Sequence, residues 1–203
     1  MFVKIPKIIQ RIYPSITWNK KSDQKEIWLT FDDGPDPKAT PWILKTLKEK
    51  EITATFFLIG EKMEEFPELV QKIKKEGHTI GNHSYSHING WTCNTKKYIA
   101  DVTKCQALMP KNYLFRPPYG KITRKQINKL KNLYNIVLWD IMAFDFQKNI
   151  KPQKIQNNII QNINNGSIIV LHNNEKSYAN IKPILSETIE KIKKSGFKFS
   201  STW

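Results

Sequence analysis

The sequence has few cysteines, few acidic residues and no long apolar runs. Its 203 residues include only two cysteines, Cys93 and Cys105. Two cysteines cannot build the framework of a disulfide-rich secreted protein. We expect both to be free thiols, with a single Cys93–Cys105 pair as the alternative. No stretch approaches the roughly 20 consecutive apolar residues that a membrane-spanning helix needs. The sequence therefore excludes both a disulfide scaffold and an integral membrane protein.

The N-terminal sequence MFVKIPKIIQRIYPS does not resemble a secretory signal peptide. Cations and prolines interrupt its apolar runs, and no small-residue cleavage site follows. We expect residues 1–25 to form a basic segment that packs on or precedes a single domain of residues 26–203. In the alternative interpretation this segment lies on a membrane surface, with its isoleucines toward lipid and its cations toward the headgroups. Either interpretation predicts a cytoplasmic or peripheral protein.

The acidic residues are too few to balance the basic ones. Lysine and arginine together number 33 against 18 for aspartate and glutamate, which gives a net charge of +15 at pH 7. Such a charge favours anionic surroundings, which include nucleic acid, lipid headgroups and acidic cell-wall polymers. The basic residues are spread along the chain without an Arg-rich tract or a nucleic-acid motif, so we expect no nucleic-acid ligand. A cell-wall polymer or a membrane surface then fits the basic surface, and we expect a monomer.

Seven short apolar segments are typical of strands that are buried on both faces, because they are rich in β-branched and aromatic residues. Helical patterns lie between them. The apolar residues of 181–192, for example, share one helical face, and Gly196 follows as a stop. This alternation predicts one α/β domain with parallel strands, built either as an open doubly wound sheet or as a barrel. The predicted strands are 26–31, 53–59, 78–82, 113–116, 135–140, 167–172 and 197–202.

Ionisable residues follow five of these predicted strands at their carboxyl ends. Because parallel strands bring their carboxyl ends to one edge, we expect these side chains to converge on one site. Each residue alone has an ordinary explanation, since a carboxylate after a strand often caps a helix. His78, at the start of its strand, should face the opposite edge as a structural residue. The residues expected at the common edge are Asp32, Asp33, His83, His87, Arg116, Asp140, Asp145 and His172.

Two histidines and one carboxylate form a three-ligand set for a divalent metal that keeps open coordination positions. The motifs HSYSH at 83–87 and TFDDGP at 30–35 supply such a set. The second carboxylate of TFDDGP would then lie close to the metal as a free base. A non-haem iron oxygenase uses the same ligands, but that chemistry normally occurs on an antiparallel jelly roll, which the strand–helix alternation does not predict.

Four motifs together resemble the signature of the NodB-like polysaccharide deacetylases, a carbohydrate esterase family. They are TFDDGP, HSYSH, RPPYG at 116–120 and IIVLHN at 168–173, and the resemblance covers residues 26–199. It implies an irregular (β/α)7-type barrel in a single domain. It also implies hydrolysis of N-acetyl groups from an N-acetylglucosamine-containing polymer of the peptidoglycan or chitin type. An O-acetyl esterase acting on a polysaccharide such as xylan, or an inactive carbohydrate-binding relative, are the alternatives.

The resemblance also implies how the metal and the base are held. By this resemblance Asp33, His83 and His87 bind a divalent metal, most often Zn2+ and sometimes Co2+ or Ni2+. Asp32 is the general base, and Arg116 pairs with it and positions it. An arginine beside the carboxylate would keep it ionised, and its planar fork suits that task better than a lysine.

The remaining residues of the resemblance act on the acetyl group and the leaving amine. The backbone N–H of Tyr119 would contribute to an oxyanion hole, while His172, oriented by Asp145, would protonate the amine. The sequence departs from the family where Asp145 is followed by phenylalanine instead of the frequent tryptophan, and where valine replaces the leucine two positions before His172. Both positions are expected to shape the acetyl pocket. The expected substrate-binding residues are Pro118, Tyr119, Phe146 and Val170.

Overall fold

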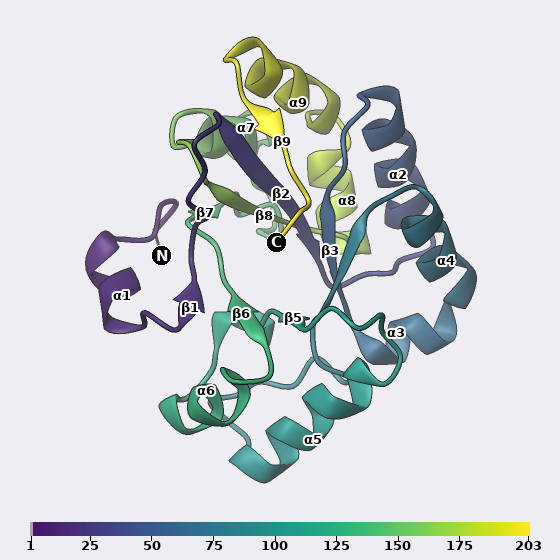
Figure 1. The fold of residues 1–203 in the computed structure, drawn as a ribbon. Helices are drawn as coiled ribbons and strands as arrows, with labels where there is room; N and C mark the ends of the chain where they lie inside the picture. Colours follow the sequence, from purple (N-terminus) through teal and green to yellow (C-terminus); the bar gives the residue numbers. More distant parts are fainter. Residues whose placement is uncertain (1) are drawn as a thin grey trace.

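A computed structural model describes residues 2–203, in which nine strands form one curled sheet with helices around its outside (Figure 1). Every pair of neighbouring strands is parallel, in the order β1-β6-β5-β4-β3-β2-β8-β7, with β9 beside β2. The predicted barrel is confirmed as a curled half-barrel. The strands are β1 (Ile16–Thr17), β2 (Glu26–Asp32), β3 (Thr55–Leu58), β4 (Thr79–Asn82), β5 (Leu114–Phe115), β6 (Asn135–Val137), β7 (Ile141–Met142), β8 (Ile168–His172) and β9 (Lys198–Phe199).

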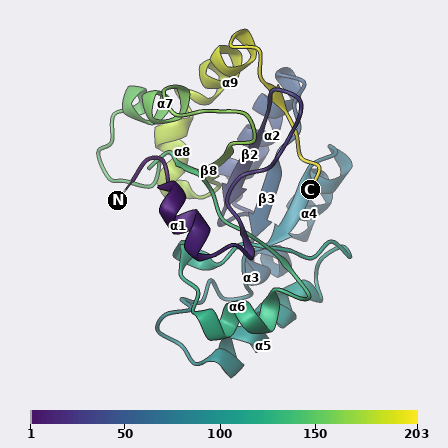
Figure 2. The same ribbon diagram turned by 60° about the vertical axis from the view of Figure 1, so that its left-hand side comes forward.

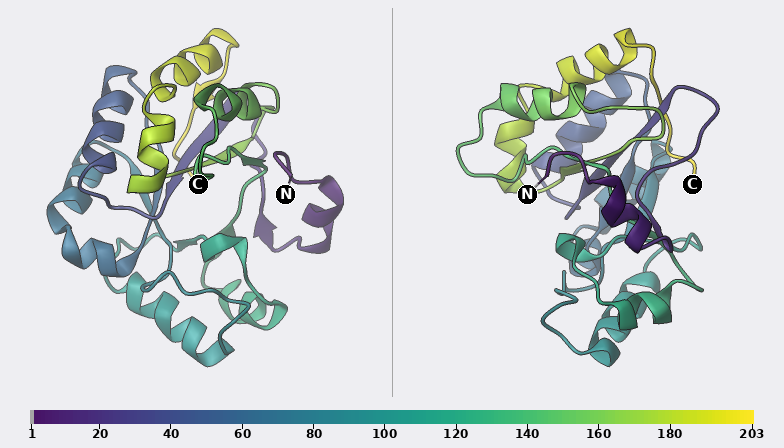
Figure 3. Two further views of the ribbon diagram at one scale, coloured as in Figure 1. Left: turned by 180° about the vertical axis from the view of Figure 1, so that it is seen from behind. Right: turned by 90° about the vertical axis from the view of Figure 1, so that its left-hand side faces the viewer.

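The helices cover the convex side of the sheet, and α5–α6 and α7–α9 lie on opposite sides of the molecule (Figure 3). The predicted helix over 181–192 is in fact two, because Pro183 cannot donate a backbone hydrogen bond at their junction. Within residues 2–203, no helix has the length and apolarity that a membrane crossing requires. The helices are α1 (Lys7–Ile12), α2 (Ala39–Glu49), α3 (Gly60–Glu65), α4 (Pro67–Lys75), α5 (Thr95–Gln106), the 3-10 turn η1 (Pro118–Gly120), α6 (Arg124–Leu130), α7 (Pro152–Ile160), α8 (Glu175–Ile181) and α9 (Leu185–Lys194).

Strand β2 separates two hydrophobic cores. Ile27, Leu29 and Phe31 belong to the core between the sheet and the helices. Trp28 belongs to the second core, on the inner side of the sheet. Because side chains of a strand alternate between its faces, Asp32 points to the same inner side as Trp28. The residue pattern of one strand therefore sends one of the two neighbouring aspartates into the barrel.

The N-terminal segment contacts both outer strands of the sheet. Strand β1 pairs with β6, while Lys4 forms an antiparallel bridge with Ile141 of β7. The Met142 N–H donates to the Val3 carbonyl at 2.8 Å. Figure 2 shows α1 at the front of the molecule in that view, between α7 and α6. The sheet thus includes residues that precede position 26. Strands β1 and β7 were not predicted, because each is paired over only two residues and, unlike β5 and β9, lies outside the seven apolar segments.

The last predicted strand, 197–202, is paired over only its second and third residues, as β9. The chain then crosses the amino end of the barrel, where the Trp28 Nε1–H donates to the Thr202 carbonyl at 2.8 Å. The Trp203 Nε1–H donates to Thr55 Oγ1 at 2.9 Å, and its ring lies 6.3 Å from that of Trp28. The C-terminal indole therefore covers the end of the barrel opposite the strand carboxyl ends.

The expectation that Asp140 belongs to the common edge is wrong. The predicted strand 135–140 divides into β6 and β7, so Asp140 stands before a strand rather than after one. Its carboxylate accepts hydrogen bonds from the Ile168 N–H at 2.8 Å and from Ser167 Oγ at 3.0 Å. Lys4 Nζ lies 3.7 Å from the same group. Asp140 therefore fixes the amino ends of β7 and β8.

Three other reactive side chains also lie outside the common edge. His78 is at the amino edge, as predicted, where its Nδ1 accepts from the Ala54 N–H at 3.2 Å. Burial lowers the pKa of His78 to about 4, so the ring is neutral near pH 7. Cys93 is half-buried and Cys105 is buried, and both are free thiols.

Candidate metal centre and active site

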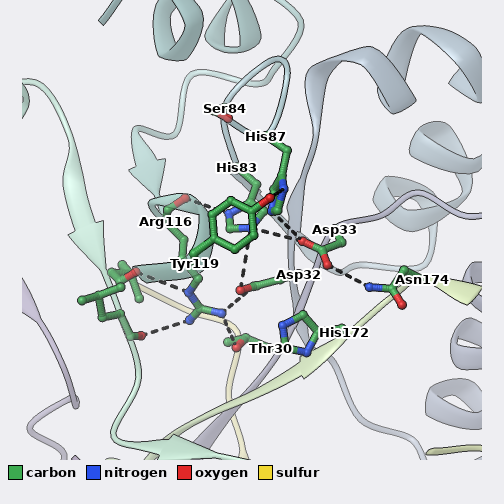
Figure 4. Close-up of polar contacts among 12 residues, drawn as sticks. Thr30, Asp32, Asp33, His83, Ser84, His87, Arg116, Tyr119, His172 and Asn174 are labelled. Atoms are coloured by element: carbon green, nitrogen blue, oxygen red, sulfur yellow. Dashed lines mark hydrogen bonds and ion pairs between the residues drawn. The ribbon is translucent and has the colours of Figure 1, made fainter. Parts of the chain in front are cut away.

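Three potential metal ligands meet at the carboxyl edge of the sheet (Figure 4). Asp33 follows β2, His83 follows β4, and His87 lies in the loop after His83. The Asp33 Oδ1 atom lies 3.4 Å from His83 Nε2 and 3.1 Å from His87 Nε2. One ligand atom from each residue fits within 4.8 Å of the others. The structure thus brings together the three residues that the sequence predicted as metal ligands.

The chemistry of this donor set fits a divalent cation. His83 Nδ1 lies 2.8 Å from the Arg116 carbonyl, so this nitrogen carries a proton that the carbonyl accepts, and Nε2 is the ring atom directed at Asp33. His87 Nδ1 is 3.1 Å from the Tyr119 hydroxyl, which leaves its Nε2 facing the same carboxylate. Burial alone would raise the pKa of Asp33, but hydrogen bonds from the two histidines lower it well below its usual value. An ionised carboxylate and two inward-facing imidazole nitrogens are suitable ligands for zinc.

Two side chains that the sequence analysis missed hold Asp33 in place. The Asn174 Nδ2–H donates to Asp33 Oδ2 at 2.8 Å, while Asn174 Oδ1 caps α8 by accepting from the Ser177 N–H. Lys62 Nζ donates to the Asp33 carbonyl at 2.8 Å. Asn174 follows His172 by two positions, which places it near the site. An asparagine just before a helix is also a common N-cap, so the sequence indicates only that role. The pattern gave no reason to assign it a second role.

Asp32 forms a buried ion pair beside the ligand cluster. Only 3% of Asp32 is exposed, and its Oδ1 accepts from Arg116 Nη1 at 2.7 Å. The same Nη1 donates to Thr30 Oγ1 at 2.7 Å. The second oxygen, Oδ2, lies 4.0 Å from His83 Nε2. Asp32 is therefore held on one oxygen, and its other oxygen faces the cluster.

Arg116 is fully buried in the barrel interior. Its Nη2 donates to the Leu138 carbonyl at 3.1 Å, its Nε donates to the Val137 carbonyl at 3.3 Å, and its guanidinium lies 4.0 Å from the centre of the Phe57 ring. Burial lowers the pKa of Arg116, and the Asp32 carboxylate opposes that shift. The planar fork thus donates to four acceptors at once, one more than the three N–H groups of a lysine could serve.

His172 and Asp145 form a second pair on the other side of Asp32. Strands β2 and β8 align Asp32 with His172 as paired residues. His172 Nδ1 lies 2.9 Å from Asp145 Oδ1, and the His172 N–H donates to Asp145 Oδ2 at 2.7 Å. Burial alone would lower the pKa of His172, but Asp145, with Asp33 and Asp32 further away, raises it to about 9. The ring is 15% exposed, so it can reach a bound molecule.

The four expected substrate-binding residues differ in accessibility. Tyr119 is 59% exposed at the rim, and Phe146 is 36% exposed with its ring edge-on to His172 at 5.1 Å. Pro118 and Val170 are buried. Val170 shares the inner face of β8 with His172, so it supports the floor of the site without reaching its surface.

Three residues of the site have left-handed backbone conformations. The φ angles are 75° at Asp33, 53° at His87 and 60° at Tyr119. Residues other than glycine rarely adopt such angles, and where they do the surrounding structure must hold them. Their clustering at the metal-ligand set indicates that these three segments are shaped for the site rather than for the stability of the backbone.

A family model described as "Polysaccharide deacetylase" matches residues 19–135, more than half of the chain. The chain therefore belongs to the polysaccharide deacetylase family, as the motifs predicted. Its parallel sheet is also not the antiparallel jelly roll expected of the iron oxygenase alternative.

Several relatives are named after a cell-wall polymer. A Bacillus cereus peptidoglycan-N-acetylglucosamine deacetylase is 37% identical over 186 residues, which cover 87% of this chain and 66% of that protein. The peptidoglycan-N-acetylmuramic acid deacetylase PdaC of Bacillus subtilis is 32% identical over 181 residues, which cover 87% of this chain and 38% of the length of PdaC. A solved structure of the Bc1960 peptidoglycan N-acetylglucosamine deacetylase has a TM-score of 0.88 and 32% identity, and the match covers 97% of this chain and 94% of that one.

Proposed function

We propose that this protein is a divalent-metal-dependent deacetylase that hydrolyses N-acetyl groups of N-acetylglucosamine-containing polysaccharide, with peptidoglycan as its main substrate class. The observation that carries the proposal is the position of Asp32. A buried, ion-paired carboxylate has its free oxygen directed at an Asp-His-His ligand set, and a carboxylate-bound histidine lies on its other side. A base, a metal site and an acid thus surround one space. The names of the relatives support peptidoglycan as the polymer.

Asp33, His83 and His87 would hold the cation, which we propose to be Zn2+, with Co2+ or Ni2+ as alternatives. When bound, it would supply Lewis-acid polarisation of the acetyl carbonyl and would lower the pKa of water. Asp32 accepts the proton of the attacking water, and Arg116 keeps this carboxylate ionised and in place. The division of labour follows from the contacts, because Asp32 is bound to an arginine and Asp33 to histidines.

The remaining residues would stabilise charge and release the amine. The Tyr119 N–H donates to the oxygen that becomes negative as water attacks the amide carbon, and one such donor is typically worth about 3 kcal/mol. His172 then gives its proton to the amide nitrogen as the C–N bond breaks, which yields acetate and a free amine. Asp145 fixes the tautomer and orientation of His172 through Nδ1, so Nε2 is the atom that delivers the proton.

We expect acetate release from peptidoglycan and from chito-oligosaccharides when the purified protein is supplied with zinc, cobalt or nickel. A chelator should stop the reaction, and re-addition of metal should restore it. Acetate released per minute, measured with each metal and substrate, checks this. Acetylated xylan serves as the O-acetyl substrate in the same panel. Activity on xylan alone would replace the proposal with an O-acetyl esterase, and no activity with any metal would favour an inactive carbohydrate-binding relative.

The Asp145→Asn variant should move the alkaline limb of the kcat/KM profile to lower pH by about one to two units. His172 must be protonated to act, and its pKa of about 9 exceeds the ordinary value of 6.5. Activity should therefore fall as pH rises through the pKa of His172. A cation bound to Asp33 would cancel that carboxylate's contribution to the raised pKa, so the alkaline limb should lie between pH 6.5 and about 9. Removal of the Asp145 charge lowers the pKa and brings the fall to lower pH. A pH–rate profile at constant metal content measures the shift.

A comparison of two substrates tests the assignment of that limb. His172→Ala should slow an acetamide substrate far more than an activated acetate ester, since the ester's leaving group needs no proton. Equal losses on both substrates, or an Asp145→Asn profile that keeps its alkaline limb, would remove the acid role from His172.

A further inference from the structure

The loop that follows His87 carries an exposed aromatic side chain that the proposed reaction does not use. Trp91 is 64% exposed. Its position is nevertheless fixed, because its Nε1–H donates to the Ile122 carbonyl at 3.3 Å and its backbone N–H donates to Asn89 Oδ1 at 3.0 Å. The loop is also anchored to α6, because Gln126 Nε2 of that helix donates to the Gly90 carbonyl at 2.8 Å. A large indole ring held in place yet open to water is suited to contact another molecule.

A lysine lies between this ring and the active site. Lys121 Nζ is 5.4 Å from the centre of the Trp91 ring and 5.8 Å from that of Tyr119. The Tyr119 ring is in turn 4.5 Å from the ring of His87. These contacts form a continuous path from a metal ligand outward to Trp91. The lysine ion pairs among residues 2–203 involve Lys4, Lys38, Lys45, Lys50 and Lys191, so no described carboxylate neutralises Lys121.

We infer that Trp91 and Lys121 form a subsite for an amino sugar that carries a carboxylate, next to the sugar that loses its acetyl group. This inference rests on the proposed function, because it places the subsite on the glycan strand that the active site would bind. A pyranose ring has an apolar face that can pack on the indole. The lysine ammonium can pair with a carboxylate on that ring, and charge-assisted hydrogen bonds of this kind are among the strong ones.

The inferred occupant separates two polymers that share N-acetylglucosamine. N-acetylmuramic acid, the other sugar of peptidoglycan, bears a free carboxylate on its lactyl group wherever no stem peptide is attached there, whereas a chitin chain is uncharged. A neutral chain would gain only the packing on Trp91, while a peptide-free muramic residue would also gain the ion pair with Lys121. The subsite thus favours peptidoglycan strands with free muramic carboxylates over chitin.

The test compares Lys121→Gln with the wild type on two substrates of equal length. One is a peptidoglycan-derived oligosaccharide with free muramic carboxylates, and the other is a chito-oligosaccharide. Lys121→Gln should lower kcat/KM on the first by about tenfold, mainly through KM, and leave the second within about twofold. Trp91→Ala should lower kcat/KM on both. Lys129→Gln, a matched loss of one exposed charge on α6, should change neither.

Methyl esterification of the muramic carboxylates should abolish the difference between Lys121→Gln and the wild type. An equal effect of Lys121→Gln on both substrates, or no effect on either, would overturn the inference. Binding of N-acetylmuramic acid and N-acetylglucosamine, followed by NMR titration, keeps this result separate from the proposed function. If the protein releases no acetate but binds the carboxylate sugar more tightly, and only with Lys121 present, the subsite stands and the deacetylase proposal fails. Equal binding of both sugars would overturn the subsite as well.

Discussion

A His83→Ala, His87→Ala double variant should contain no divalent metal, and its acetate release should fall to the assay background. The two Nε2 atoms face one carboxylate oxygen at 3.4 and 3.1 Å, so their removal leaves Asp33 as the only member of the ligand cluster. A single carboxylate does not hold a divalent cation against water and buffer. Metal content per chain, measured by mass spectrometry after gel filtration, and acetate release from the same preparation check both parts.

Of the four histidines, all within residues 2–203, His78 is the one that lies away from the catalytic groups, and it provides the matched control. His78 is at the opposite edge of the sheet, where it accepts a backbone hydrogen bond. His78→Asn keeps a hydrogen-bond acceptor and should retain both metal and activity. Circular dichroism of each variant shows whether the fold is intact. Full metal occupancy in a folded double variant would refute the ligand assignment, and with it the metal-dependent mechanism.

Exchange of the two neighbouring aspartates for asparagine should give two different defects. Asp32→Asn should keep the metal and lower kcat by about 10²- to 10⁴-fold, the usual contribution of a general base. The asparagine oxygen can still accept from Arg116 Nη1, so the side chain stays in place without its basicity. Asp33→Asn should instead lose metal, because a ligand loses its charge between two imidazoles.

Metal titrations of both variants, followed by kcat at saturating metal, separate these defects. Excess metal should restore much of the activity of Asp33→Asn and none of that of Asp32→Asn. Lowered metal affinity of the same size in both variants would show that the two carboxylates share the cation. The assignment of Asp32 as a free base would then have to be withdrawn.

The strands with four or more residues and the convergence of the site could be predicted from the sequence. Strands β2 and β8 carry long apolar runs that end on Asp32 and His172, and the topology of parallel strands puts those ends together. HSYSH likewise follows an apolar segment, so the positions of His83 and His87 at the same edge follow from the same argument. These predictions depend on one rule, that the carboxyl ends of parallel strands lie at the same edge of a sheet, and the strands of the structure are parallel.

Features that depend on short pairings or on dual-purpose side chains could not be predicted. Asp140 follows an apolar run as Asp32 does, yet the chain breaks before it and starts β7 after it. Two residues of strand leave no periodicity to detect. Thr30 and Asn174 contact Arg116 and Asp33 through single hydrogen bonds that are visible only when the chain is folded. Threonine is common in strands and asparagine at helix N-caps, where neither has a catalytic part.

The left-handed backbone at Asp33, His87 and Tyr119 sets stability against chemistry in this protein. Glycine adopts such angles at little cost, so it would relax the backbone at each of these positions and would remove a functional side chain. Directed evolution that sorts variants for thermal resistance alone would therefore reward the loss of the site. A more heat-resistant variant of this protein must be sought in the core between the sheet and the helices and at the helix ends, with these three positions unchanged.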